Sequence, residues 1–280
     1  MASVNAPIGI FDSGVGGLSI LRPLRAQLPA EPIVFFADQA HVPYGPRPLD
    51  EVRRFSVGIT RFLIDQGAKL IVVACNTASA AALQHLRGVF LGMPFVGMEP
   101  AVKPAAEQTR TRRVGVLATP ATFQGALFAS VVERFAHGVR VIPQTLPGLV
   151  ERIEAGDLDG PETRRIIETA VRPLVAQGVD TLVLACTHYP FVIPLIAEAA
   201  GPGVQVIDPS PAIARQAARL LADGGKLAPA GESGMTTLVT SGNPARLAAM
   251  ALRLIGESGE ARRGVWDEAG EGLALSGDSV

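Results

Sequence analysis

Asp180-Thr181-Leu182-Val183-Leu184-Ala185-Cys186-Thr187-His188-Tyr189-Pro190 is the stretch on which the interpretation of the chain depends. Its apolar run, Leu182 to Ala185, is typical of a buried strand, and a helical pattern resumes at Phe191. A second copy reads Lys69-Leu70-Ile71-Val72-Val73-Ala74-Cys75-Asn76-Thr77-Ala78. The chain has two cysteines, and both follow these strands. Because ligands bind outside the carboxyl ends of parallel strands, both thiols are expected at a binding site.

The two copies belong to a longer duplication. Strands are expected to start near residues 8, 33, 70 and 94, and again near 114, 139, 181 and 204. The spacings agree within the few-residue error of such boundaries. Strands that alternate with helices predict right-handed βαβ units and mostly parallel sheets. We therefore expect an α/β fold of two pseudo-symmetric, doubly wound domains, with the active site in the cleft between them.

The order of the elements also predicts the domain boundaries. A helix over 211–221 and a strand over 237–241 are expected to return to the first half. The first domain is then residues 1–98 plus 210–257, and the second is residues 99–209. Residues 258–280 are rich in glycine and polar residues, and they are expected to form a tail.

In each half, one proline-rich segment follows the second strand. His41 to Pro48 contains too much proline for a helix or a central strand, and Pro143 to Pro147 is expected to be a loop for the same reason.

Composition excludes several classes of function. The 280 residues are 48% hydrophobic and 18% charged, which favours a well-packed enzyme. A net charge of −1 offers no basic surface for nucleic acid or an anionic membrane. No apolar stretch approaches the roughly 18 residues of a membrane span. The N-terminus lacks the pattern of a signal peptide, so reduced thiols in the cytoplasm are expected.

A symmetric pair of thiols suits the inversion of a stereocentre. One group removes a proton from one face of a carbon, and the other returns a proton to the opposite face. A thiol with a pKa of about 8.5 can act as base or acid near neutrality. A helix N-terminus after each cysteine would favour the thiolate. Asn76-Thr77 and Thr187-His188 supply hydrogen-bond donors for a carboxylate or an enolate-like intermediate.

An amino-acid carbanion is commonly stabilised by pyridoxal phosphate. Lys69, Lys103 and Lys226 do not stand at a polar strand exit suited to a Schiff base. The sequence therefore favours a mechanism without cofactor.

Other chemistries remain open on the residues alone. Each cysteine could be a small buried hydrophobe, the pair could form a disulfide, and Cys75, Cys186 and His188 could bind zinc, although a fourth ligand is missing. The glycine-rich turn after Asp12 could hold phosphate, but it lacks the lysine of a P-loop. It also resembles the start of an aspartate-nucleophile phosphatase, with Gly14 in place of the second aspartate. Two lobes around a cleft also describe binding proteins.

Four motifs together resemble the bacterial glutamate racemases, which belong to the cofactor-independent aspartate/glutamate racemase superfamily. The motifs are Phe11-Asp12-Ser13-Gly14-Val15-Gly16-Gly17-Leu18, Pro43-Tyr44-Gly45, Ala74-Cys75-Asn76-Thr77-Ala78 and Ala185-Cys186-Thr187-His188-Tyr189-Pro190. The resemblance covers residues 8–221. It implies a two-base racemase that supplies D-glutamate for peptidoglycan synthesis.

The resemblance also implies roles for individual residues. Cys75 would deprotonate D-glutamate with support from Asp12, and Cys186 would deprotonate L-glutamate with support from His188. Glu154 matches an assisting glutamate, although Thr145-Leu146-Pro147 departs from the Ala-Cys-Pro of the family. The implied substrate-binding residues are Asp12, Ser13, Pro43, Tyr44, Gly45, Asn76, Thr77, Thr119, Thr187 and His188.

The expected partner is glutamate, bound by a homodimer that needs neither metal nor other cofactor. The nearest alternative is a racemase of the same superfamily that acts on aspartate or a hydantoin. Asn76-Thr77 and Thr187-His188 favour the glutamate branch.

Overall fold

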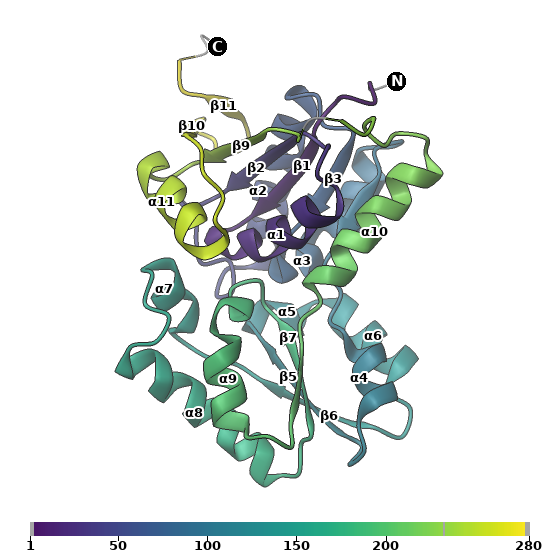
Figure 1. Ribbon diagram of the computed structural model, residues 1–280, viewed down its shortest axis with the longest axis vertical. Helices are drawn as coiled ribbons and strands as arrows, with labels where there is room; N and C mark the ends of the chain where they lie inside the picture. Colours follow the sequence, from purple (N-terminus) through teal and green to yellow (C-terminus); the bar gives the residue numbers. More distant parts are fainter. Residues whose placement is uncertain (1–2, 232, 278–280) are drawn as a thin grey trace.

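The fold consists of two α/β lobes, each built on its own sheet, in a computed structural model that describes residues 3–231 and 233–277 (Figure 1). The first lobe contains both ends of the chain, and the second is formed by the middle. The carboxyl ends of the parallel strands of both lobes point toward the boundary between them.

The sheet of the first lobe has the strand order β11-β10-β9-β2-β1-β3-β4 and is parallel except for β11. Its strands are β1 (Ile8–Asp12), β2 (Ile33–Ala37), β3 (Leu70–Val73), β4 (Phe95–Gly97), β9 (Thr236–Thr240), β10 (Ala261–Trp266) and β11 (Leu273–Leu275). The central strands β1, β2 and β3 are apolar along nearly their whole length because helices cover both faces of the sheet.

The helices of the first lobe form two layers. One face is covered by α1 (Leu18–Gln27), α10 (Ser210–Asp223) and α11 (Pro244–Ile255), and the other by α2 (Leu49–Asp65) and α3 (Asn76–Val89). A short 3-10 turn, η1 (Val15–Gly17), connects β1 to α1.

The second lobe repeats this plan on a smaller scale. Its sheet has the order β6-β5-β7-β8, with β5 (Arg113–Ala118), β6 (Arg140–Gln144), β7 (Thr181–Ala185) and β8 (Gln205–Ile207), all parallel. One face carries α7 (Leu149–Glu154), α8 (Pro161–Ala176) and α9 (Ile193–Ala200), and the other carries α4 (Val102–Gln108) and α6 (Ala126–Phe135). The short α5 (Pro120–Gln124) packs against α3 of the first lobe.

The strand orders confirm the duplication predicted from the sequence. The order β4-β3-β1-β2 in the first sheet matches β8-β7-β5-β6 in the second. Cys75 follows β3 and Cys186 follows β7, so the two cysteines leave equivalent strands.

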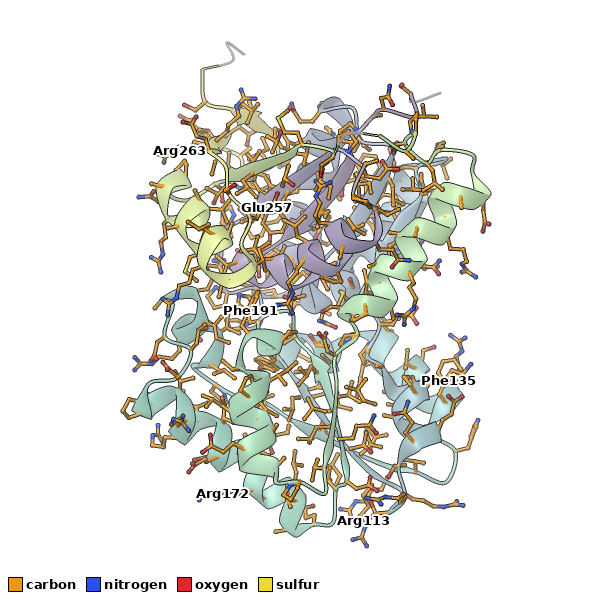
Figure 2. All side chains as sticks on the ribbon, in the orientation of Figure 1. Arg113, Phe135, Arg172, Phe191, Glu257 and Arg263 are labelled. Atoms are coloured by element: carbon orange, nitrogen blue, oxygen red, sulfur yellow. The ribbon has the colours of Figure 1, made fainter. Side chains whose placement is uncertain are left out.

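The chain passes between the lobes twice. It leaves the first lobe between β4 and α4 and returns between β8 and α10. Phe191 packs against the apolar cores of both lobes and marks their boundary (Figure 2). Within residues 3–231 and 233–277, no helix is long and apolar enough to cross a membrane.

The expectation of a tail after Glu257 is wrong for the residues that the structure describes; Asp278, Ser279 and Val280 lie outside them. Strand β10 pairs in parallel with β9, and β11 pairs with β10. Gly264 is buried, and Trp266 and Leu273 pack on the core beneath α2. The polar residues of this segment face solvent near the edge of the sheet, which gives it the composition of a tail.

Two local expectations also differ from the structure. Pro143 lies within β6 instead of a loop, and it is tolerated there because β6 is an edge strand. After Cys186 the chain forms a 3-10 turn, η2 (Tyr189–Val192), before α9 begins at Ile193.

Candidate active site

A small cavity lies between the lobes, at the carboxyl ends of both sheets. Its volume is about 20 Å³. It is lined by Ser13, Pro43, Tyr44, Gly45, Cys75, Asn76, Thr77, Thr119, Val150, Ala185, Cys186, Thr187 and His188. Both thiols are free, and they belong to this one lining. The cavity therefore joins the two cysteines that the sequence places at equivalent strand ends.

Cys75 is held by the first turn of a helix. It is the N-cap residue of α3, and its sulfur accepts a hydrogen bond from the Ala78 N–H at 3.4 Å. The next residue, Asn76, is buried, and its side-chain amide has no hydrogen-bond partner among the residues that the structure describes. An unpartnered buried amide that lines a cavity is available to a ligand.

Asp12 stands behind Cys75 at the end of β1. One carboxylate oxygen accepts hydrogen bonds from the Gly17 N–H at 2.7 Å and from the Thr187 hydroxyl at 3.4 Å. The other is buried and finds no hydrogen-bond partner in the described part of the chain. Burial raises the pKa of Asp12 above its usual value, against the opposing pull of His188. Asp12 therefore accepts a proton more readily than an exposed aspartate does.

The helix N-terminus favours a thiolate at Cys75, as expected, but other effects outweigh it in this conformation. Burial, followed by the negative charge of Asp12, raises the pKa of the Cys75 thiol well above its usual value, and the Ala78 N–H opposes this only in part. Cys75 is therefore a thiol here, and Asp12 is the base next to it. Desolvation and a like charge outweigh one amide dipole.

Cys186 has a histidine as its partner. Its sulfur lies 3.8 Å from Nδ1 of His188, and Nε2 of His188 lies 2.7 Å from Oε1 of Glu154. Burial opposes a charge on His188, but its hydrogen bonds to Cys186 and Glu154 raise its pKa well above the usual value. Burial alone would raise the pKa of the Glu154 carboxyl, but the hydrogen bond from His188 outweighs it, and the pKa is lowered. The pair is consequently an imidazolium and a carboxylate.

The strand register explains why the two thiols have different partners. In the first sheet Ile8 pairs with Leu70, which sets Asp12 beside Ala74, the residue before Cys75. In the second sheet Ala118 pairs with Ala185, the residue before Cys186. The position of Asp12 is therefore occupied by an alanine in the second half, and the supporting group comes from His188 instead.

Buried hydrogen bonds join the lobes around the cavity. The Val15 N–H donates to Oε1 of Glu154 at 2.7 Å, and the Ser19 hydroxyl donates to the Thr187 carbonyl at 2.9 Å. The hydroxyls of Thr77 and Thr119 lie 2.9 Å apart. Because each of these contacts crosses from one lobe to the other, the structure represents a closed state.

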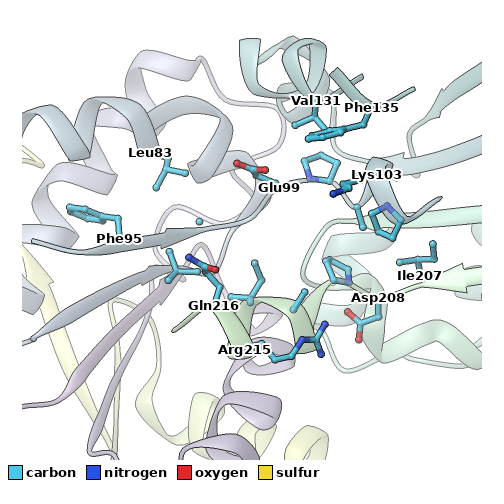
Figure 3. Close-up of a pocket in the computed structure, with 18 of the residues that line it drawn as sticks. Leu83, Phe95, Glu99, Lys103, Val131, Phe135, Ile207, Asp208, Arg215 and Gln216 are labelled. Carbon is cyan, nitrogen blue, oxygen red and sulfur yellow. The ribbon is translucent and has the colours of Figure 1, made fainter. Parts of the chain in front are cut away.

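The closed cavity is too small for an amino acid. A volume of about 20 Å³ has room for roughly one water molecule. A larger cavity of about 510 Å³ lies away from both thiols, next to the two linkers between the lobes (Figure 3). Its lining includes Glu99 and Pro100 of one linker and Asp208 and Pro209 of the other. The cleft must therefore open for a substrate to reach the cysteines.

The structure places eleven of the thirteen residues singled out from the sequence in the cavity lining, all except Asp12 and Glu154. These two lie behind the lining and contact it through Thr187 and His188. Sequence reasoning missed Val150, an apolar residue of α7 without any distinguishing signal. It also passed over Asp38, which directly follows β2 and could have been found from its place at a strand exit.

Within the described part of the chain, no group of three or more His, Cys, Asp and Glu side chains is arranged to hold a metal ion.

Comparison with known proteins agrees with this geometry. The sequence model of the Asp/Glu/hydantoin racemase family matches residues 8–217. The chain belongs to this family. It is an amino-acid racemase, and racemases are isomerases.

Curated relatives match this racemase over most of its length. The glutamate racemase of Pseudomonas paraeruginosa is 52% identical over 244 residues, which are 87% of this chain and 92% of that protein. The glutamate racemase of Roseiflexus sp. is 50% identical over 249 residues, which are 89% of this chain and 92% of that protein.

Solved structures match the racemase in both lobes. Glutamate racemase from Thermus thermophilus, in complex with beta-chloro-D-alanine, has a TM-score of 0.79 at 38% identity. The enzyme from Francisella tularensis, in complex with D-glutamate, has a TM-score of 0.82 at 28% identity. Each match covers 94% of this chain and 98% of the other. The α/β fold predicted from the sequence is confirmed.

Proposed function

We propose that the chain interconverts L- and D-glutamate with Cys75 and Cys186 as its two acid–base groups. The choice of glutamate rests on the family and on curated glutamate racemases about half identical to the chain over nearly its whole length. The product D-glutamate serves peptidoglycan synthesis. The observation that carries the mechanism is that both sulfurs line one cavity from opposite lobes.

In the direction from D- to L-glutamate, Cys75 gives its thiol proton to Asp12 and removes the α-proton of the substrate. Cys186 delivers its thiol proton to the opposite face of the same carbon. The negative charge that develops on the substrate carboxylate is stabilised by hydrogen-bond donors that are in place before the reaction. Asn76 is suited to this role because its buried amide has no other partner.

In the reverse direction Cys186 is the base. The imidazolium of His188, 3.8 Å from the sulfur, stabilises the thiolate of Cys186, and Glu154 keeps His188 charged. Cys75 then returns a proton to the D face. Five further lining residues are proposed to hold the two carboxylates and the ammonium group: Ser13, Gly45, Thr77, Thr119 and Thr187.

Replacement of each cysteine tests this mechanism. Cys75→Ser and Cys186→Ser should each lower racemisation by about 100-fold or more, because a hydroxyl is a much weaker acid than a thiol. Calorimetry with D-glutamate should show that binding is largely retained. In deuterated water the parent should place deuterium at Cα of the product enantiomer. A Cys75→Ser rate within a few-fold of the parent, or an unlabelled product, would contradict the two-thiol mechanism.

Substrate choice is tested by parallel assays of L-glutamate and L-aspartate through loss of circular dichroism. Glutamate should be racemised much faster. Faster turnover of aspartate would place the chain in the other branch of the superfamily.

We further propose a cytoplasmic homodimer that uses neither metal nor pyridoxal phosphate and does not bind nucleic acid. The free thiols of the site support a reducing compartment. Size-exclusion chromatography with light scattering tests the dimer. Activity should also persist after dialysis against a metal chelator and hydroxylamine, and its loss would overturn the proposal of a cofactor-free enzyme.

A further inference from the structure

A saturated carboxylate lies just outside the cavity. Asp38 follows β2 and is fully buried. Its Oδ1 accepts hydrogen bonds from the Ser241 hydroxyl at 2.7 Å and from the indole N–H of Trp266 at 2.9 Å. Its Oδ2 accepts from the Tyr44 hydroxyl at 2.6 Å and lies 2.9 Å from Nδ1 of His41. A carboxylate has about four acceptor positions, so Asp38 is occupied by the protein and is not free for the substrate.

Asp38 anchors the loop that forms one wall of the cavity. The buried Tyr44 commits its single hydroxyl proton to Asp38 and cannot donate it to a ligand, while Pro43, Tyr44 and Gly45 all line the cavity. The Gly45 carbonyl also accepts a hydrogen bond from the Ala121 N–H of the other lobe at 3.2 Å. The position of Asp38 therefore determines the shape of the cavity and its contact with the second lobe.

Trp266 reaches Asp38 from the far end of the sequence. It is the last residue of β10, and the following turn is fixed by Asp267, whose carboxylate accepts the N–H groups of Glu271 and Gly272. The indole packs on α2, where a Cβ at Gly58 would lie 2.6 Å from its ring. Its ring centroid is 5.8 Å from that of Phe55. The indole is thus held by its packing and by this turn, which makes its N–H a fixed donor.

We propose that Trp266 is a positioning residue for racemisation: through its indole N–H it fixes Asp38, and through Asp38 it holds the Tyr44–Gly45 loop in the form that binds substrate. This role depends on the proposed glutamate site, but it adds a segment that does not touch the cavity. Because each cysteine is carried by another element, the loss of this bond should affect binding more than proton transfer.

Trp266→Phe separates the N–H from the packing of the ring. We expect the KM for D-glutamate to rise about 3- to 10-fold, because a loop that must be ordered on binding lowers affinity. The kcat should stay within about twofold of the parent, since the groups that transfer protons are untouched. Ser241→Ala, which removes a second donor to Oδ1 at the residue after β9, should raise KM in the same way. Val265→Ala, at an exposed neighbour on β10, is the matched control and should leave KM unchanged.

The parent chain provides a second measurement without substitution. Trp266 is its single tryptophan, so tryptophan fluorescence reports on this residue alone. Titration with D-glutamate should change the emission and saturate at the concentration that saturates binding. An unchanged KM in both variants, or emission that does not respond at saturating D-glutamate, would overturn the role of Trp266.

The outcomes also separate this inference from the proposed function. If the parent fails to racemise glutamate, or keeps its rate in Cys75→Ser, the two-thiol function itself is wrong. If the parent racemises glutamate through its thiols and Trp266→Phe behaves like the parent, only the positioning role is wrong.

Discussion

The two thiols carry out equivalent tasks in different surroundings. Burial and the neighbouring carboxylate of Asp12 raise the pKa of the Cys75 thiol. Cys186 instead lies next to the imidazolium of His188, which is paired with Glu154. In this conformation Cys75 needs a base and Cys186 has a cation to stabilise its thiolate. In the proposed mechanism each removes a proton from a different enantiomer, so the chemistry of the two directions should differ in detail although the equilibrium constant between enantiomers is one.

Glu154→Gln tests the histidine side. The change keeps the size of the side chain but removes the negative charge that stabilises the imidazolium of His188. The value of kcat/KM should therefore fall about 10- to 100-fold. The equilibrium requires an equal fall in both directions. With substrates deuterated at Cα, the isotope effect should grow for L-glutamate and shrink for D-glutamate, because only Cys186 loses support. Glu151→Gln, at an exposed position of the same helix, is the control. Isotope effects that stay equal would contradict the assignment.

The His188–Glu154 pair should also be visible in the pH dependence of stability. Although burial opposes the charge on His188, its pKa is raised, so its contribution is complete below its usual value of 6.5 and is lost as pH rises through the raised value. The lowered pKa of Glu154 makes its contribution complete above 4.5 and lost as pH falls through the lowered value. The pair therefore stabilises the fold most between pH 4.5 and 6.5.

Thermal unfolding of the parent and of His188→Gln across this range provides the measurement. The difference in the free energy of unfolding should be about 1–3 kcal/mol between these two values. It should shrink as the pH moves beyond either side. A difference that does not vary with pH would show that the pair carries no net charge interaction.

At the scale of elements, the glycine-rich turn after β1 matters because its glycines have no side chain. A Cβ on Gly16 would lie 2.6 Å from both Nδ1 of His188 and Oγ1 of Thr187. A Cβ on Gly14 would lie 1.9 Å from Oε1 of Glu154. The turn is therefore glycine-rich to let the second lobe approach it closely.

Gly16→Ala should lower kcat/KM about 100-fold, because His188 and Thr187 must move away from their working positions. Gly88→Ala is the matched control within helix α3, where an added Cβ meets nothing within 4 Å. It should keep the activity and stabilise the fold by up to about 1 kcal/mol. Steady-state kinetics and thermal unfolding of both variants test these two expectations. Full activity of Gly16→Ala would mean that the close approach of the lobes is not needed for turnover.

At the scale of the whole molecule, the lobes close over a cavity that has no room for the substrate. The two linkers between β4 and α4 and between β8 and α10 are the covalent connections across which this closure takes place. Hydrogen bonds such as that of Ser19 to Thr187 stabilise the closed form and must break when the cleft opens. Substrate affinity is therefore coupled to the contacts between the lobes.

Ser19→Ala removes one of these contacts. The free energy of unfolding should fall by about 1 kcal/mol, and KM should change about fivefold because the balance between open and closed forms shifts by the same energy. Ser56→Ala is the control: its buried hydroxyl bonds to the Val52 carbonyl within α2, at 2.8 Å. It should lose similar stability with KM unchanged. Equal KM values in the two variants would refute the coupling.

Much of the architecture could be predicted because the signals are local. The duplication was predicted from the apolar strands, the polar residues after them and the spacing between them. The same pattern predicted that Cys75 and Cys186 face one cleft, and both line one cavity. The segment after Glu257 was misjudged because an exposed strand near the edge of a sheet and a tail share a polar composition. Asp38 was passed over because its role depends on Ser241 and Trp266, which are more than 200 residues away in sequence.

The sequence by itself determined the two-lobed α/β fold and the pairing of the thiols, because strand periodicity and chain order dictate which strand ends meet. Only the tertiary structure decided the protonation of the site and the state of the cleft. The pKa of Cys75 depends on how deeply it is buried beside Asp12, and the closed cavity depends on contacts between lobes. The pKa of Cys75 and the closure of the cavity each depend on contacts between residues far apart in the sequence. A local sequence pattern cannot predict such contacts.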